Sequence, residues 1–282
     1  LLAALMVCTI FAGCAKPVEK PNTDQTPNPT ENTENPPEET KDPVEPAAPA
    51  EKHENKVVYG STTEISGDLG NAWWTNNATD KMIRDLINDY DTVIFDQFGQ
   101  MVMNETTAAS IDQEQHDDGS ISFTVKINEG LVYNNGEPIT AADYVAYALV
   151  AYSPATLAAG GKLVPESVVG GMEYQKGETK ELTGVRLLDE YTYSIHITPE
   201  KSQYYYALTY ASLSPLYLPM YGGEGLTVKD DGNGAYLDGG ELTADGINAS
   251  RYVYEGRVSA GPYSIKKLDT GSLTATLEIN PN

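Results

Sequence analysis

The sequence predicts an α/β fold of the mixed α+β kind, preceded by a leader and a long linker. Three observations favour this fold class. Apolar and polar residues alternate strictly over 121–127, which indicates a half-buried strand. Apolar residues spaced by three and four over 78–90 indicate an amphipathic helix. Further strand pairs and helical segments then follow one another along the chain, so helices and strands are interspersed.

The chain opens on the apolar run LLAALMVCTIFAGCAKP and does not begin with Met. The run is shorter than the roughly 20 apolar residues of a transmembrane helix, so we expect residues 1–14 to be a secretory signal whose charged start is missing. Its end, FAGC, resembles the lipobox of bacterial lipoproteins, which implies that Cys14 carries a lipid. The alternative is that Cys14 is an ordinary signal-peptide residue. The other cysteine, Cys8, also lies in this run, so the mature chain has no disulfide.

Residues 15–56 are rich in Pro, Glu, Asn and Thr and contain very few apolar residues. Such a segment cannot bury enough surface to fold, and its prolines favour an extended spacer. We therefore predict a disordered tether. The formal net charge of the whole chain is −23, which argues against binding nucleic acid through its phosphates.

The first predicted elements are a β-rich run at 56–62 and the helix that follows it. Asn77 is placed to cap this helix, and Asp80 suits its first turn. The residues expected on its buried face are Met82, Ile83, Leu86, Ile87 and Tyr90.

The strand at 121–127 should bury Ile121, Phe123, Val125 and Ile127. Asn135-Gly136 then marks a tight turn. Thr140 and Asp143 form the capping-box pattern of a helix, and the residues expected on its inward face are Tyr144, Val145, Ala148 and Leu149.

The remaining segments alternate in the same way. A strand pair is predicted within 183–199, with its turn at Asp189-Glu190, and a short aromatic helix follows within 201–219. The Gly- and Asp-rich stretch 222–246 is expected to be a flexible acidic insertion. Two strands joined by a turn are expected last, within 260–280.

No catalytic or metal-binding motif is apparent, so we expect no enzyme activity, no cofactor and no metal. His53, His116 and His196 are scattered in the sequence, and His196 is expected on a solvated strand face. The acidic run from Asp230 to Glu241 does not fit a calcium loop, because Tyr236 occupies the sixth position counted from Asp231, where glycine is required.

Aromatic residues are the positive feature of the sequence. There are 19 tyrosines and two tryptophans against four phenylalanines. Tyr and Trp suit sites that bind polar organic ligands, but they also suit protein cores. For the adjacent pair Trp73 and Trp74, in a loop rich in Gly and Asn, both interpretations remain open.

Several segments together resemble the extracellular solute-binding protein family 5, the peptide-binding components of ABC importers. The resemblance rests on FTVKINEGLVYNNGEPITAADYVAYAL, GVRLLDEYTYSIHIT, YYYALTYASLSPLYLP and AGPYSIKKLDTGSLTATLEINPN, in that order. It implies a periplasmic-binding-protein-like type II fold with two lobes and a cleft. Only the first lobe, 57–88 with 180–282, and a small inserted domain, 89–179, would be present. The segment between Tyr221 and Gly246 is extra to the family pattern.

The resemblance also implies a function. The protein would capture oligopeptides outside the cell, held to the membrane through the lipid on Cys14, and deliver them to permease subunits. Its ligand contacts would be Trp74, Thr75, Asn76, Asn77 and Tyr263. The alternatives are an oligosaccharide-binding component of the same transporter class, a peptide sensor without transport, and a surface-anchored hydrolase.

Overall fold

The structure, a computed structural model, describes residues 55–203 and 205–282. The chain divides into residues 1–57 and residues 58–282, and the fold described below belongs to the second unit. The predicted signal, Cys14 and the tether as far as residue 54 lie outside the described residues. Within the described part, no helix is both long and apolar enough to cross a bilayer.

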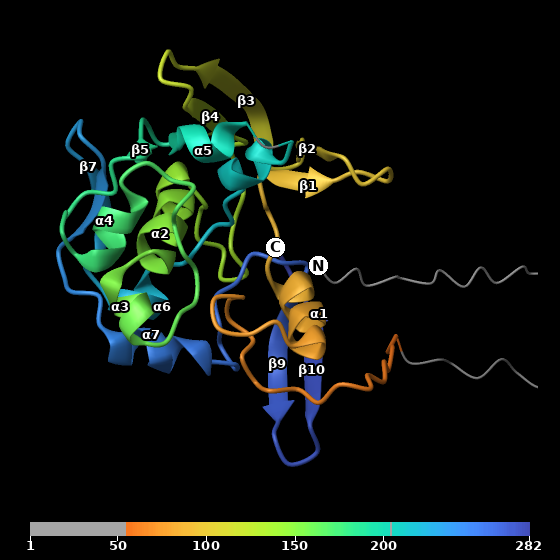
Figure 1. The fold of residues 1–282 in the computed structure, drawn as a ribbon. Coiled ribbons are helices and arrows are strands. Elements are labelled where there is room, and N and C mark those ends of the chain that lie inside the picture. The colour runs from red at the N-terminus through yellow and green to blue at the C-terminus, as the bar shows by residue number, and fades with distance from the viewer. Residues whose placement is uncertain (1–54, 204) are drawn as a thin grey trace, which may run out of the picture. The chain divides into compact units, whose positions relative to one another are not determined.

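A four-stranded antiparallel sheet forms the centre of the larger core (Figure 1). Its strands lie in the order β3 (Ala108–Gln115), β4 (Ile121–Ile127), β6 (Thr192–Ile197) and β5 (Val185–Leu187). The predicted alternation in β4 is confirmed, because its odd-numbered residues are buried and its even-numbered residues are more exposed. β4 pairs with β6, so this sheet takes strands from both sides of residue 179. The division into a lobe and an inserted domain stays a prediction.

Helix α2 (Ala141–Ala151) packs against this sheet. The expected cap is present, since the Asp143 carboxylate accepts a hydrogen bond of 2.8 Å from the backbone N–H of Thr140. All four residues expected on the inward face are fully buried, namely Tyr144, Val145, Ala148 and Leu149. The spacing of apolar residues and the capping-box pattern therefore predicted this helix correctly.

Shorter elements surround the sheet and α2. A hairpin of β1 (Val93–Phe95) and β2 (Met101–Met103) precedes β3. The short helices are α3 (Pro154–Ala158), α4 (Gly171–Lys176), α5 (Pro199–Ser202), the 3-10 helix η1 (Ala207–Ala211) and α6 (Pro219–Gly222). Helix α7 (Ala244–Arg251) contacts α3 and α6.

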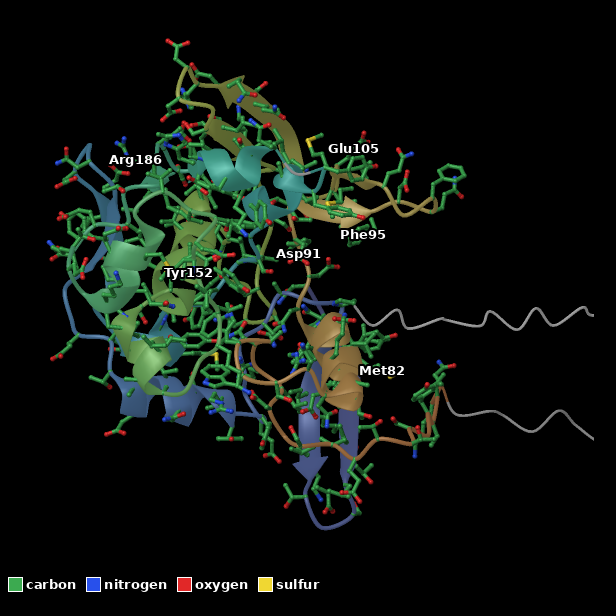
Figure 2. All side chains as sticks on the ribbon, viewed as in Figure 1. Met82, Asp91, Phe95, Glu105, Tyr152 and Arg186 are labelled. Carbon is green, nitrogen blue, oxygen red and sulfur yellow. The ribbon has the colours of Figure 1, made fainter. Side chains whose placement is uncertain are left out.

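A second, smaller core joins the first described helix to the last two strands. Helix α1 (Ala78–Ile87) lies against the hairpin of β9 (Tyr263–Asp269) and β10 (Thr274–Ile279) (Figure 1). Ile83 and Ile87 are buried there, as expected. Met82 and Leu86 were predicted on the same face, but they are 41% and 40% exposed. Figure 2 labels Met82 on α1. The prediction was too broad, because a two-stranded hairpin covers only one side of the helix.

Two other expectations are wrong. The stretch expected to be a flexible insertion contains a hairpin of β7 (Thr227–Asp230) and β8 (Ala235–Asp238). This hairpin is attached to the main sheet, since Leu182 N–H donates to the Ala235 carbonyl at 2.8 Å and Arg186 pairs with Asp230 at 2.8 Å. The run 56–62, expected to be β-rich, forms no strand, and Val57 is 93% exposed.

Candidate ligand-binding surface

The loop before α1 is held in place at its start by two hydrogen bonds. Near its start, the Gly67 carbonyl accepts a hydrogen bond of 2.8 Å from the Tyr254 hydroxyl. The buried carboxylate of Asp80, in the first turn of α1, accepts one of 3.0 Å from the backbone N–H of Ser66. The loop residues 66–77, which contain four of the five predicted contact residues, are therefore fixed to the body rather than free.

Both tryptophans of this loop are buried, with Trp73 1% and Trp74 7% exposed. The Trp73 ring packs edge-on against Tyr147 of α2 at a centroid distance of 5.6 Å, and its Nε1 donates to the Tyr147 hydroxyl at 3.2 Å. Its further ring neighbours are Trp74, at 5.4 Å, and Tyr221 of α6, at 5.9 Å. Core packing thus accounts for Trp73, while a ligand contact by Trp74 stays a prediction.

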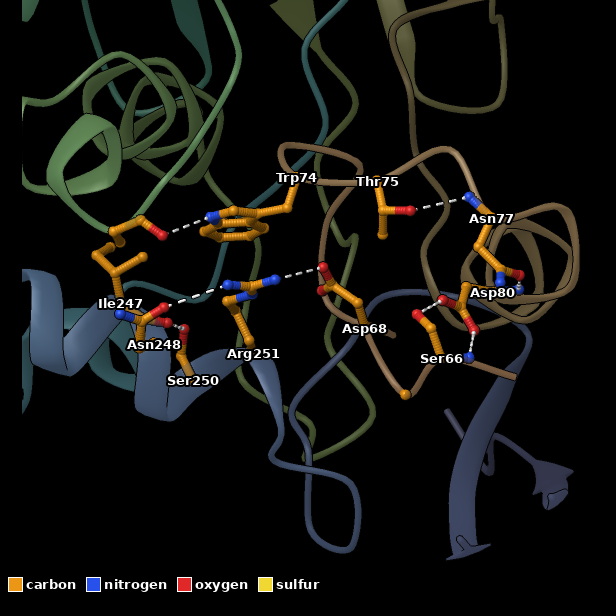
Figure 3. Close-up of polar contacts among 12 residues, drawn as sticks. Ser66, Asp68, Trp74, Thr75, Asn77, Asp80, Ile247, Asn248, Ser250 and Arg251 are labelled. Carbon is orange, nitrogen blue, oxygen red and sulfur yellow. Dashed lines mark hydrogen bonds and ion pairs between the residues drawn. The ribbon is translucent and has the colours of Figure 1, made fainter. Parts of the chain in front are cut away.

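Trp74 is surrounded by groups from two other segments (Figure 3). Its indole N–H donates to the Ala159 carbonyl at 3.1 Å. The guanidinium of Arg251, at the end of α7, lies over its ring. Arg251 also forms an ion pair of 2.9 Å with Asp68, whose side chain is 4% exposed. The indole nitrogen of Trp74 is thus already bonded within the protein, and the Arg251 guanidinium covers one face of its ring.

Thr75 and Asn77 form the N-terminal cap of α1 (Figure 3). The Asn77 side-chain oxygen accepts hydrogen bonds from the backbone N–H groups of Thr79 and Asp80, at 2.9 and 3.0 Å. The Thr75 hydroxyl accepts one from the N–H of Asn77 at 3.2 Å. Asn76 between them is exposed. Of the predicted contact residues in this loop, Asn76 presents the most accessible polar side chain.

Tyr263 is separated from the other four predicted residues. It begins β9 and is 36% exposed. The nearby Gly261 N–H donates to the Ile87 carbonyl at 2.8 Å, so this part of the chain lies at the C-terminal end of α1. The loop 74–77 lies at the N-terminal end of the same helix. A helix of 10 residues is about 15 Å long. Tyr263 therefore lies about one helix length from the loop, whose four predicted residues are consecutive in the sequence.

A small hollow of about 20 Å³ lies beside this loop, which is room for about one water molecule. Side chains from the loop, from the segment 215–221 and from the segment 257–260 line it. The Tyr221 hydroxyl accepts hydrogen bonds from Asn71 Nδ2 at 2.6 Å and from Arg257 Nη2 at 3.4 Å. The polar lining residues that sequence analysis missed are Asn71, Asn88, Tyr133, Tyr217, Tyr221, Arg257 and Ser259. The only sequence signal for any of them was the high number of tyrosines, which concerns the tyrosines among them.

Two tyrosines at the hollow donate hydrogen bonds to nearby carboxylates. The Tyr133 hydroxyl donates to Asp143 at 3.0 Å, and the Tyr217 hydroxyl donates to Glu137 at 2.8 Å. Burial raises the pKa of Tyr133, and the hydrogen bond to Glu137 raises the pKa of Tyr217. Both phenols therefore stay protonated at neutral pH and act as donors.

His116 and His196, scattered in the sequence, meet in the structure. Their ring centroids are 4.8 Å apart because β3 and β6 flank β4. His196 Nε2 lies 2.7 Å from the Ser120 hydroxyl, which in turn donates to Asp118. The carboxylate thus contacts the serine and not the imidazole, unlike a catalytic triad. Among the described residues, no three or more His, Cys, Asp or Glu side chains are grouped to hold a metal ion.

The fold of this chain is similar to that of solved proteins. No protein-family model and no curated protein sequence matches the chain. The oligopeptide-binding protein AppA of Bacillus subtilis, solved with a nonapeptide, matches with a TM-score of 0.51 and 19% identity, over 78% of this chain and 35% of that chain. The oligopeptide-binding protein OppAIV of Borrelia burgdorferi matches with a TM-score of 0.51 and 20% identity, over 77% of this chain and 38% of that one.

The described fold is that of part of a solute-binding protein. This confirms the predicted fold class, a mixed α/β fold of the periplasmic binding-protein type. At 19% and 20% identity the two matches concern the fold alone. The chain spans 35% and 38% of the length of these two proteins.

Proposed function

We propose that the chain is part of a substrate-binding protein that captures oligopeptides for an ABC importer. The observation that carries the proposal is the match of more than three quarters of the chain to two oligopeptide-binding proteins, one of them holding a nonapeptide. The four sequence segments that resemble solute-binding protein family 5 support the same function. In this proposal the protein binds its ligand and performs no catalysis.

The loop 74–77 and Tyr263 are the proposed ligand contacts. Asn76 carries an exposed amide with one acceptor and two donors, which suits the main chain of a peptide held in extended form. Tyr263 adds a partly exposed phenol. Trp74 and Asn77 would act mainly by fixing the shape of the loop, because their polar atoms are bonded within the protein.

The setting of the protein is part of the proposal. A lipid on Cys14 would anchor the chain to the outer side of the cell membrane, and the proline-rich tether 15–56 would hold the folded part away from it. Permease subunits of the transporter would then receive the peptide. Residues 57–88 with 180–282 would form the first lobe, and residues 89–179 its inserted domain.

Thermal melting of the full-length protein, made without its lipid, tests the proposal. The protein is heated with a pool of short peptides and, separately, with a pool of oligosaccharides. A ligand at about 100 times its dissociation constant stabilises the folded state by roughly 2.7 kcal/mol. We expect a higher melting temperature with peptides alone. A rise with sugars alone, or with neither pool, would contradict the proposal.

Variants then locate the ligand on the structure. Asn76→Ala should weaken peptide binding without changing the melting temperature of the free protein. Asn233→Ala is the matched control, because Asn233 is an exposed asparagine in the β7–β8 turn. Equal peptide binding by both variants would remove Asn76 from the proposed site.

A further inference from the structure

Arg257 is a buried cation without a carboxylate partner among the described residues. It is 6% exposed. Its Nη1 donates to the backbone carbonyls of Ser250 and Val253, at 2.9 and 3.3 Å, and its Nη2 donates to the Tyr221 hydroxyl. The remaining nitrogen, Nε, is buried and has no hydrogen-bond partner. A buried guanidinium with an unused donor is costly unless an acceptor completes its shell.

Two other arginines nearby lie next to Asp68, and one of them, Arg251, also has a buried Nε without a hydrogen-bond partner. Arg251 pairs with the Asp68 carboxylate. Arg84 donates to the Asp68 carbonyl at 2.7 Å, so it lies next to the same acidic residue. Arg257 has only the carbonyls at the C-terminal end of α7, where the helix carries a partial negative charge. Of the three, Arg257 alone combines a buried Nε that has no hydrogen-bond partner with the lack of an ion pair to a carboxylate.

The hollow beside Arg257 is lined by hydrogen-bond donors. The Tyr221 hydroxyl already accepts two hydrogen bonds, so its own proton is free to be donated. Asn88 uses one amide hydrogen on the Gly70 carbonyl, at 3.2 Å, and retains a second. Asn71 likewise retains one after bonding Tyr221. The residues that line the hollow include no aspartate and no glutamate.

The local backbone allows this arginine to lie where it does. A Cβ atom at Gly70 would be 2.9 Å from Nη2 of Arg257 and 3.5 Å from its Cζ. Any other residue at position 70 would therefore push the guanidinium away from Tyr221. Glycine at this position lets the loop backbone and the arginine approach each other closely.

We propose that the hollow is a subsite for a carboxylate group of the bound peptide, with Arg257, Tyr221, Asn71 and Asn88 as its donors. The inference rests on the proposed function, because the carboxylate belongs to the peptide ligand. About 20 Å³ admits one oxygen atom, so one carboxylate oxygen enters the hollow and the other stays at its mouth. The carboxylate is either an acidic side chain or the C-terminus of the peptide.

Four peptide pools separate these two sources. One pool contains Asp and Glu and has free C-termini. The others replace the acids by Asn and Gln, the C-terminus by an amide, or both. Dissociation constants for the full-length protein are measured by calorimetry. We expect removal of one of the two kinds of carboxylate to weaken binding by about tenfold or more, because hydrogen bonds between charged groups are the strong ones.

Variants test whether this difference in affinity between the peptide pools arises at the hollow. Arg257→Gln should abolish the difference between acid and amide pools. Tyr221→Phe keeps the ring and removes one donor, so it should reduce the difference, and it serves if Arg257→Gln does not fold. Arg186→Gln is the matched control, because Arg186 pairs with Asp230 on the β7 hairpin and does not line the hollow. It should discriminate as the unmodified protein does.

The outcomes distinguish the subsite from the proposed function. If all four pools bind equally, or if Arg257→Gln still discriminates, the subsite is wrong and peptide binding stands. If no pool binds, peptide capture fails, and sodium formate then tests the hollow as a free carboxylate. Formate must raise the melting temperature of the unmodified protein more than that of Arg257→Gln. An equal rise in both would overturn the subsite.

Discussion

The guanidinium carbon of Arg251 lies 4.2 Å from the centroid of the Trp74 indole ring, although the two residues are 177 positions apart in the sequence. Cation–π attraction of this kind stabilises by about 0.5–2 kcal/mol. The same guanidinium pairs with Asp68. One side chain at the end of α7 thus fixes both the ring of Trp74 and the loop that carries it.

Removing this guanidinium should therefore destabilise the protein. Arg251→Met leaves the buried Asp68 carboxylate without its ion-pair partner, and we expect the free energy of unfolding to fall by about 3 kcal/mol. Urea denaturation of the variant and of the unmodified protein measures this loss of unfolding free energy. Lys81→Met is the control, because its pair with Asp85 is well exposed, and the loss there should be under about 1 kcal/mol. Equal losses would show that the Asp68 pair is no more important than a surface pair.

Removing the N-terminal cap of α1 should destabilise the protein. Asn77→Ala removes the acceptor for two backbone N–H groups, so we expect a loss of about 1 kcal/mol in unfolding free energy. Asn77→Asp keeps an acceptor and should restore most of it. A stability unchanged in Asn77→Ala would mean that this cap does not hold the helix.

Gly261 should not tolerate a side chain. A Cβ atom there would be 2.3 Å from the Ile87 carbonyl carbon and 2.6 Å from the Leu86 oxygen. Because both are backbone atoms of α1, relief requires moving the helix, and Gly261→Ala should cost about 2–3 kcal/mol. Gly60→Ala meets no atom within 4 Å and should be nearly neutral. Thermal melting of the two variants side by side checks this contrast.

His196 should make the stability of the protein depend on pH. Burial and the neighbouring His116 lower the pKa of His196, and Asp118 only partly opposes them. As pH falls below about 6.5, the unfolded chain takes up a proton before folded His196 does. The stability that neutral His196 contributes is thus complete above that pH and is lost as pH falls through the folded pKa.

Melting temperatures of the unmodified protein and of His196→Asn, recorded from pH 7.5 to pH 5, measure this contribution. The difference between the two should shrink or reverse as the pH falls. Parallel curves would show that His196 does not titrate in this range with a lowered pKa.

Buried tryptophans should be visible in fluorescence. Trp73 and Trp74 are the only tryptophans of the chain and are nearly inaccessible to solvent. Emission should therefore lie to the blue of that of the unfolded protein and be quenched weakly by acrylamide. Tyr59, at 71% exposure, shows that aromatic residues of this chain are not buried by default. Strong quenching of the folded protein would contradict the placement of the loop.

Local patterns predicted most of the elements correctly. The alternation in β4 and the capping box of α2 are properties of a few adjacent residues, so the sequence alone sufficed. The attachment of β7–β8 depends on Leu182 and Arg186, about 50 residues earlier, and nothing near Asp230 reveals them. The same limit hid the contact between His116 and His196, which follows from strand order rather than from sequence spacing.

The candidate site was harder to predict for a similar reason. Motif resemblance pointed to the loop 74–77, which the structure keeps together. Arg257 and Tyr221 meet Asn71 only because α6, α7 and the loop converge, and single tyrosines and arginines carry no signal for such convergence. Amphipathic spacing likewise could not show that Met82 and Leu86 remain exposed, since that depends on how wide a surface β9 and β10 cover.

The pairing of α1 with the β9–β10 hairpin also has a consequence for biosynthesis. Ile83 and Ile87 form their core with Leu69 and with Ile265 of β9, so the helix lacks its main apolar partner until residue 265 has been synthesised. An isolated helix of 10 residues is unstable in water. The first helix of the body therefore stays open while the intervening segments are translated, and it can close only when the C-terminal hairpin arrives. The core around α1 therefore joins two segments that are synthesised almost 200 residues apart.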